Sequence, residues 1–211
     1  MKKIQERKIQ VLKYIIEEYL KTGEITGSKS LLKKYDLQDS SATVRNDMAA
    51  LEQMGLIFQP YNSAGRLPTT RGLRVFVDYL METMPAVFLE AEQELQDRLE
   101  KNRIDDTLYH LVTRLTKITG EITFAAIPSL GTSYYLGLSN YLERHHGMLG
   151  DEMFQVIKCL ENKYQFIDLL DSLDVSPRVS AFIGEENVIP ELESSTMIVK
   201  KIQIGEYTGY L

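Results

Sequence analysis

The amino-acid sequence predicts an α+β protein built from two parts. Residues 1–80 show mainly helical periodicity, whereas the later residues alternate helical stretches with strand-like runs, which is typical of helices flanking an antiparallel sheet. The formal charge divides at the same place: residues 1–80 carry 13 Lys and Arg against 9 Asp and Glu, and residues 81–211 carry 11 against 21. A net +4 followed by a net −10 favours binding of nucleic acid by one end only.

Two helices are predicted at the start of the chain. The stretch from Lys8 to Thr22 carries an apolar stripe over about four turns and ends at Gly23. Ser28 is expected to cap a second, shorter helix from Lys29 to Tyr35, and residues 36–39 form a tight turn. This order predicts the first half of a helix-turn-helix.

The third helix is predicted between Ser40, its N-cap, and Gly55, its stop. One face can be buried, because apolar residues recur at i, i+4 and i+7, namely Val44, Met48 and Leu51. The other side of its first two turns carries short hydrogen-bonding side chains and one guanidinium, from Ser41, Thr43, Arg45 and Asn46. In a DNA major groove Arg reads guanine and Asn reads adenine. An ordinary polar surface helix is the alternative, and the neighbouring elements favour DNA recognition.

A hairpin is predicted directly after this helix. The run Leu56 to Phe58 is too short for a helix and indicates a strand, residues 59–66 have the composition of a loop, and Leu67 begins the return strand. A hairpin after a recognition helix is a wing, so residues 1–81 are predicted to form a winged helix-turn-helix domain. The predicted DNA-binding residues are Lys29, Ser41, Thr43, Arg45, Asn46, Asn62, Ser63 and Arg66.

Two residues of this region have open interpretations. Arg66, beside Gly65 at the expected loop tip, is predicted to reach a phosphate or a minor groove, and a solvated loop charge is the alternative. Gly72 lies in the first turn of a predicted helix from Arg71 to Met81, which Thr69 or Thr70 caps. Because a helical glycine costs about 1 kcal/mol relative to Ala, Gly72 indicates either close packing or close approach of the backbone to DNA.

The second part of the chain predicts a linker followed by a sheet domain. Residues 82–104 form an acidic linker helix opened by Pro85, and its apolar stripe packs either on a partner helix or on its own domain. A helix follows from Asp105 to Lys117, and a long helical stretch from Glu152 to Leu173 breaks near Asn162. The predicted strands are 122–127, 134–138, 179–183, 196–204 and 207–211.

The motif Ser40–Asn46 together with the hairpin motif Ser63–Thr69 resembles the N-terminal domain of HrcA, a family of bacterial heat-inducible transcription repressors. Further stretches that match this domain are Glu17–Tyr19, Thr22–Glu24, Gly27–Ser28, Lys33–Leu37, Leu51–Glu52, Gly55 and Gln59–Pro60. Residues 105–211 resemble, more loosely, the GAF-like α+β domain of that family, through Thr116–Gly120, Tyr134–Asn140, Phe182–Asn187 and Val199–Gly205.

The resemblance implies a transcriptional repressor of chaperone genes. It implies an inverted-repeat DNA operator, a homodimer as the binding form, and the chaperonin GroEL as a partner that keeps the repressor active. Two departures from the family pattern stand out. Little room remains between Asn140 and Asp151 for the inserted dimerisation region that family members usually carry, and this chain stops at Leu211 where the family continues.

Other classes of protein are disfavoured by the sequence. No run of 18 apolar residues predicts a membrane span, and the N-terminus lacks the apolar segment of a secretory signal. The single cysteine, Cys159, fits a reducing cytoplasm and is predicted to be a small buried hydrophobe. His145 and His146 have no third ligand at metal spacing, so a solvated loop is expected. No catalytic motif occurs, and neither an enzyme activity nor a cofactor or metal is predicted.

Two alternatives from other functional classes stay open. The first is a regulator whose GAF-like domain binds a small molecule, with the acidic loop Glu185–Asn187 at the rim of its pocket. The second is a protein-interaction module that uses the winged helix as a docking surface.

Overall fold

The computed structural model describes residues 6–35, 39–62, 64–83, 104–144, 150–176 and 178–211. The chain forms two compact units, Met1–Pro85 and Ala86–Leu211. The predicted linker helix over 82–104 lies outside the described residues except at its ends, as do Pro85, Ser63 and the pair His145–His146. Among the described residues, no helix is both long and apolar enough to cross a membrane.

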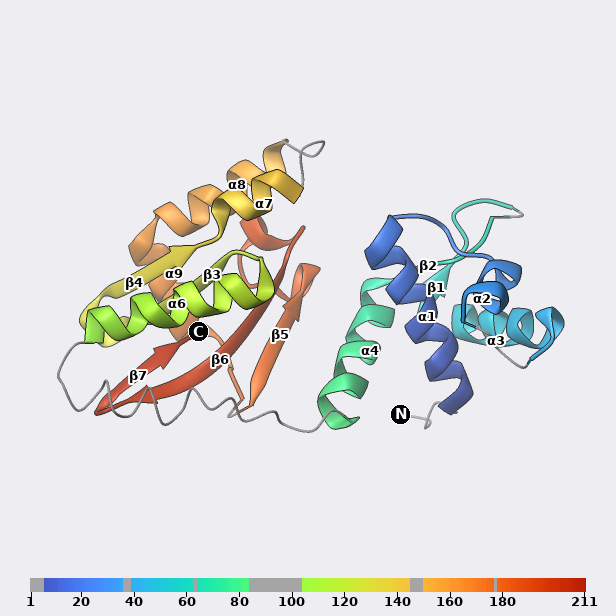
Figure 1. The fold of residues 1–211 in the computed structure, drawn as a ribbon, viewed down its shortest axis with the longest axis horizontal. Coiled ribbons are helices and arrows are strands. Elements are labelled where there is room, and N and C mark those ends of the chain that lie inside the picture. The colour runs from blue at the N-terminus through green and yellow to red at the C-terminus, as the bar shows by residue number, and fades with distance from the viewer. Residues whose placement is uncertain (1–5, 36–38, 63, 84–103, 145–149, 177) are drawn as a thin grey trace. The chain divides into compact units, whose positions relative to one another are not determined.

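Within the described residues, the first unit consists of four helices and a two-stranded antiparallel hairpin (Figure 1). In chain order these are α1 (Glu6–Thr22), α2 (Ser28–Tyr35), α3 (Ser41–Gln53), β1 (Ile57–Phe58), β2 (Leu67–Pro68) and α4 (Thr70–Thr83). One apolar cluster joins them, because α1 packs on α2, α3, α4 and β2. The predicted order of helix, short helix, helix, hairpin and helix is confirmed.

The ends of these helices follow local sequence signals. Ser40 caps α3, because its Oγ accepts from the backbone N of Thr43 at 3.1 Å, and Gly55 follows the helix at φ +70°. The predicted cap of α2 was wrong by one residue. Ser28 is already helical, and the Gly27 carbonyl accepts the first helical hydrogen bond, from the N of Leu31 at 3.1 Å.

Close packing explains the glycine in the first turn of α4. A Cβ on Gly72 would overlap the backbone carbonyl oxygen of Leu56, so the helix rests directly on the chain that leads into β1. The Oγ1 of Thr69 accepts from the N of Gly72 at 3.0 Å, which makes Thr69 rather than Thr70 the cap. Of the two interpretations of Gly72, packing is therefore the one that the structure supports.

The second unit is a five-stranded antiparallel sheet with the order β4-β3-β7-β6-β5. The strands are β3 (Thr123–Ile127), β4 (Thr132–Leu136), β5 (Val179–Ile183), β6 (Thr196–Ile204) and β7 (Tyr207–Tyr210). The helices are α6 (Ile104–Thr119), α7 (Leu138–Arg144), α8 (Asp151–Glu161) and α9 (Lys163–Ser172), with short 3-10 turns at Pro128–Leu130, Gly184–Glu186 and Pro190–Leu192. The predicted α+β class is confirmed for this unit.

Helices cover both faces of the sheet (Figure 1). Helix α6 lies over β3 and β4 with Leu108 and Val112 fully buried, and α8 and α9 bury a larger cluster on the opposite face. The strand predicted at 134–138 lies instead at 132–136, because β4 pairs in full with β3, from Thr132 opposite Ile127 to Leu136 opposite Thr123. Asn162 separates α8 from α9, as predicted.

Candidate nucleic-acid interface

Helix α3 has one buried and one exposed face. Val44, Met48 and Leu51 are buried in the core of the first unit, as their spacing predicted. Away from this buried stripe Arg45 and Asn46 are adjacent and exposed, and the small side chains of Ala42 and Ala49 beside them are exposed too, as is Gln53 at the end of the helix. A guanidinium and an amide are therefore exposed on the helix, with the donors and acceptors that read base edges.

Two other predicted DNA-binding residues of α3 are engaged in hydrogen bonds within the protein. The Oγ of Ser41 lies 3.2 Å from the Oγ of Ser28, so this pair connects the first turns of α2 and α3. The Oγ1 of Thr43 lies 2.9 Å from the Oγ of the capping Ser40. Both side chains are half-buried, and they orient the start of α3 as well as bordering its exposed face.

A buried carboxylate holds α3 against α1. Asp47 is 3% exposed, and the Arg7 guanidinium donates to it twice, from Nε at 2.7 Å and from Nη2 at 2.9 Å. These hydrogen bonds to Asp47 raise the pKa of Arg7 above its ordinary value. Because two parallel hydrogen bonds fix both distance and angle, Arg7 orients the helix that presents Arg45.

A second buried carboxylate connects α1 with α2. Glu18 is 6% exposed, accepts from Lys34 Nζ, and accepts from the Tyr35 hydroxyl at 3.1 Å. The hydrogen bond from Lys34 lowers the pKa of Glu18, against the opposing effect of burial. Burial, followed by the contact with Glu18, raises the pKa of Tyr35 to about 12. The positive charge of Lys34 thus serves to connect α2 with α1.

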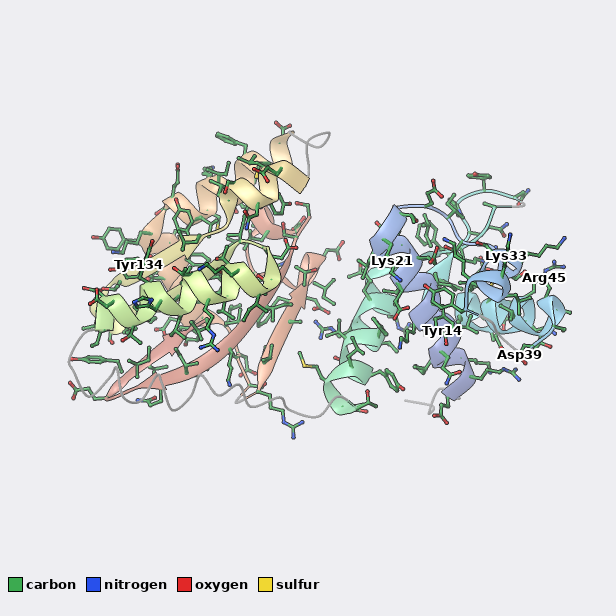
Figure 2. The ribbon with its side chains drawn as sticks, in the orientation of Figure 1. Tyr14, Lys21, Lys33, Asp39, Arg45 and Tyr134 are labelled. Atoms are coloured by element: carbon green, nitrogen blue, oxygen red, sulfur yellow. The ribbon has the colours of Figure 1, made fainter. Side chains whose placement is uncertain are left out.

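Helix α2 presents other cations to solvent. Lys29 and Lys33 lie one turn apart and are both exposed, so they share one face of the helix. Figure 2 shows Lys33 and Arg45 on the outer side of α2 and α3. Lys33 was not among the predicted DNA-binding residues, although its i+4 spacing from Lys29 was a readable signal.

The hairpin differs from the prediction in the place of Arg66. Tyr61, 65% exposed, and Asn62, also exposed, lie in the loop between β1 and β2. Arg66 lies at the base of the hairpin, where its backbone pairs with Thr26, with N···O distances of 2.8 and 3.1 Å. Gly65 serves this contact, because a Cβ there would overlap the Thr26 carbonyl oxygen. The expectation that Arg66 extends from a free tip was therefore wrong.

A cleft of about 540 Å³ brings the three regions together. It lies between the start of α2, the exposed side of α3 and the base of the hairpin. Its lining residues are Gly27, Ser28, Lys29, Arg45, Met48, Gln59, Ala64, Gly65 and Arg66. Three of the predicted DNA-binding residues, Lys29, Arg45 and Arg66, thus surround one space in which an anion would meet positive charge.

The second unit was expected to be free of catalytic and metal chemistry. Cys159 is buried, and burial raises the pKa of its thiol to about 11, which keeps it protonated at neutral pH. In the described part of the chain, no group of three or more His, Cys, Asp or Glu is arranged to hold a metal ion. The loop around Asn187 holds itself together, because the buried Asn187 Nδ2 donates to the carbonyls of Gly184, Leu192 and Ser195 at 2.9–3.0 Å.

Comparisons with known proteins point to one family. A family model described as "HrcA protein C terminal domain" matches residues 66–211. A protein of Alkaliphilus metalliredigens named heat-inducible transcription repressor HrcA is 41% identical over 128 residues, which cover 60% of this chain and 37% of that protein. Proteins of the same name from Clostridium perfringens and Bifidobacterium adolescentis are 43% and 42% identical, over 55% and 61% of this chain and 36% and 34% of their own lengths.

These curated relatives are much longer than this chain, which spans little more than a third of their length. A solved structure described as "Crystal structure of a hypothetical protein at 2.2 A resolution" is also similar. It covers 99% of this chain and 90% of its own, with a TM-score of 0.71 and 19% sequence identity, so the likeness concerns the fold alone.

Proposed function

Because the chain belongs to the HrcA family of heat-inducible transcription repressors, we propose that it is a sequence-specific DNA-binding repressor of heat-shock genes. The family is one of transcription repressors and not of enzymes. Residues 1–81 act as a winged helix-turn-helix domain, with α3 as recognition helix and the β1–β2 hairpin as wing. Residues 105–211 act as a GAF-like domain, which the five-stranded antiparallel sheet between helices supports.

The observation that carries this proposal is the exposed pair Arg45 and Asn46 on a helix held from behind. The Ser40 cap, the Ser28–Ser41 contact and the Arg7–Asp47 ion pair all restrain α3. Side chains that read bases need such restraint, because discrimination between bases depends on hydrogen-bond geometry. Arg45 and Asn46 contact base edges in the major groove.

The remaining predicted residues border this contact. Lys29 contacts phosphate beside the recognition helix, and Ser41 and Thr43 lie at its edge. Asn62 and Ser63 of the wing reach the flanking DNA, and Arg66 belongs to the interface from the wall of the cleft. A phosphate contact such as that of Lys29 sets the register of a protein on DNA and carries no sequence information directly.

Partners follow from the form of the operator and from the family. An inverted repeat needs two recognition helices one helical turn or a multiple apart, which one winged helix cannot supply. A homodimer therefore binds the operator, in the cytoplasm where the DNA lies. The chaperonin GroEL is a further proposed partner, and its only support is family membership.

An electrophoretic titration with an inverted-repeat chaperone operator, next to a duplex of the same composition with scrambled half-sites, tests the proposal. At one fixed salt concentration the operator is expected to bind roughly a thousandfold more tightly or better. Light scattering of the complex is expected to give two chains for each operator. Equal affinity for both duplexes would refute sequence-specific repression.

A further inference from the structure

Glu52 and Arg66 form an ion pair that the predicted DNA interface did not include. We infer that they form a positioning pair, which fixes the β1–β2 hairpin against the end of α3, and that Arg66 acts through this pair instead of binding a phosphate. The inference rests on the proposed function, because its consequence is how well the wing meets DNA. The ion pair joins residues 14 positions apart in the chain.

All three nitrogens of the Arg66 guanidinium are occupied. Nε and Nη2 donate to Oε2 of Glu52 at 3.2 and 2.9 Å, and Nη1 donates to the carbonyls of Ala64 and Gly65 at 3.3 and 3.4 Å. The Arg66 side chain is 18% exposed. The edge formed by Nε and Nη2, which could bind a phosphate through two hydrogen bonds, is thus already bound to Glu52.

The same residue is fixed through its backbone. The Arg66 N donates to the Thr26 carbonyl at 2.8 Å, and the Thr26 N donates to the Arg66 carbonyl at 3.1 Å. Nearby, Gln59 Nε2 donates to the Ala64 carbonyl at 3.0 Å, across the base of the loop. Glu52 therefore adds a third anchor, on α3, to a hairpin base that is already attached to the α1–α2 connection. The exposed residues Tyr61 and Asn62 lie in the loop that these anchors close, so the inference is that the anchors position them.

Electrostatics favour positioning over phosphate binding. A phosphate that took Arg66 would leave the Glu52 carboxylate unpaired close to that phosphate, and like charges at short range repel. With the pair intact, Lys29 and Arg45 supply the positive charge of the cleft. The two roles therefore predict opposite changes in DNA affinity for Glu52→Gln. Release of a phosphate-binding Arg66 would tighten DNA binding, whereas loss of an anchor weakens it.

The test measures operator affinity and its salt dependence for wild type, Glu52→Gln, Arg66→Gln, Arg66→Lys and the double variant Glu52→Gln with Arg66→Gln. Each single variant is expected to weaken operator binding about threefold or more. The double variant is expected to bind no more weakly than the weaker-binding of the two single neutral variants, because each substitution removes the same contact. The log–log salt slope of Arg66→Gln stays at the wild-type value, whereas loss of a phosphate contact would reduce it by about 1.

Arg66→Lys separates the two roles even if neutral variants fold poorly. Lysine keeps the point charge that a phosphate needs and loses the two-nitrogen edge that Glu52 needs. It is expected to bind as weakly as Arg66→Gln, and wild-type affinity for Arg66→Lys would overturn the inference. Glu24→Gln, which removes an exposed carboxylate from the α1–α2 connection, measures the general effect of one less negative charge.

Amide hydrogen exchange in the protein without DNA provides a second readout. The amide of Ala64, which donates to the Tyr61 carbonyl at 3.1 Å, is expected to exchange faster in Glu52→Gln and Arg66→Lys than in wild type. Unchanged exchange, or tighter operator binding by Glu52→Gln, overturns the positioning pair. A wild-type protein without operator preference would instead refute the proposed function, while the exchange result still decides whether Glu52 and Arg66 anchor the hairpin.

Discussion

Both units of the chain have apolar cores, and they differ in the other contacts that connect their elements. In the first unit, ion pairs run between elements: Arg7–Asp47 joins α1 to α3, Lys34–Glu18 joins α2 to α1, and Arg66–Glu52 joins the hairpin to α3. In the second unit, a continuous antiparallel sheet carries apolar clusters on both faces. A two-stranded hairpin connects fewer elements through backbone pairing than a five-stranded sheet does, and side-chain ion pairs add connections between the elements of the first unit.

This difference affects how the positive charge of the first unit is interpreted. Because charged side chains also connect the elements of the first unit, a basic residue there is not a DNA contact by virtue of its charge. Pairing, and not burial, separates two groups of basic residues. Arg7, Lys34 and Arg66 each pair with a carboxylate, although the Arg7 and Lys34 side chains are about half exposed. Lys29, Lys33 and Arg45 are exposed and make no ion pair with another described residue.

The largest expected effect tests whether both units depend on apolar burial to the same degree. Leu51 in the first unit and Leu170 in the second are each 0% exposed. Replacement of either by Ala is expected to lower the free energy of unfolding by about 2–5 kcal/mol, through lost transfer energy and a residual cavity. Denaturant unfolding, followed by hydrogen exchange within the affected unit, measures the loss. Leu20→Ala, at a residue 69% exposed, is the control. If Leu51→Ala lost no more unfolding free energy than Leu20→Ala, the first unit would not depend on apolar burial as the second does.

The next effect separates DNA contact from stability inside the first unit. Arg45→Ala is expected to weaken specific operator binding by about 1–3 kcal/mol, because a guanidinium held on a base edge is lost. Thermal unfolding should be unchanged, since the side chain is exposed. Arg178→Ala, at an exposed arginine of the second unit, is the matched control. Unchanged operator affinity at fixed salt would remove Arg45 from the base contacts.

The smallest effect concerns acid stability of the first unit. Because Lys34 lowers the pKa of Glu18 in the folded state, the contribution of Glu18 is fully present above its ordinary value of 4.5 and is lost as pH falls through the lower folded pKa. Glu18→Gln is therefore expected to reduce stability at neutral pH and to flatten its decline in acid. Urea unfolding from neutral to acidic pH measures both. If Glu18→Gln declined in acid as steeply as wild type or as the exposed-site control Glu161→Gln, another carboxylate would be responsible.

The sequence determined the parts of the fold that depend on neighbours along the chain. The Ser40 cap and the Gly55 stop bound α3, Asn162 separates α8 from α9, and the strands 179–183 and 196–204 lie where alternation and composition predicted them. Such signals are local, because capping, turn formation and periodic burial involve residues a few positions apart. The exposed pair Arg45 and Asn46 was predictable for the same reason: the buried stripe of a helix determines which face remains.

The pairing of residues far apart in the chain depends on how the whole unit packs. Arg7 pairs with Asp47 across 40 positions, and Arg66 pairs with Glu52, although its sequence context predicted a contact with DNA and left a solvated loop charge as the alternative. Gly65 and Gly72 had been open to a role at the DNA surface, and each instead lets two backbones of the protein touch. The physical reason is common to these residues. A buried or half-buried charge requires a partner, and a glycine permits close approach of another group. Only the packing of the whole unit determines which group that is.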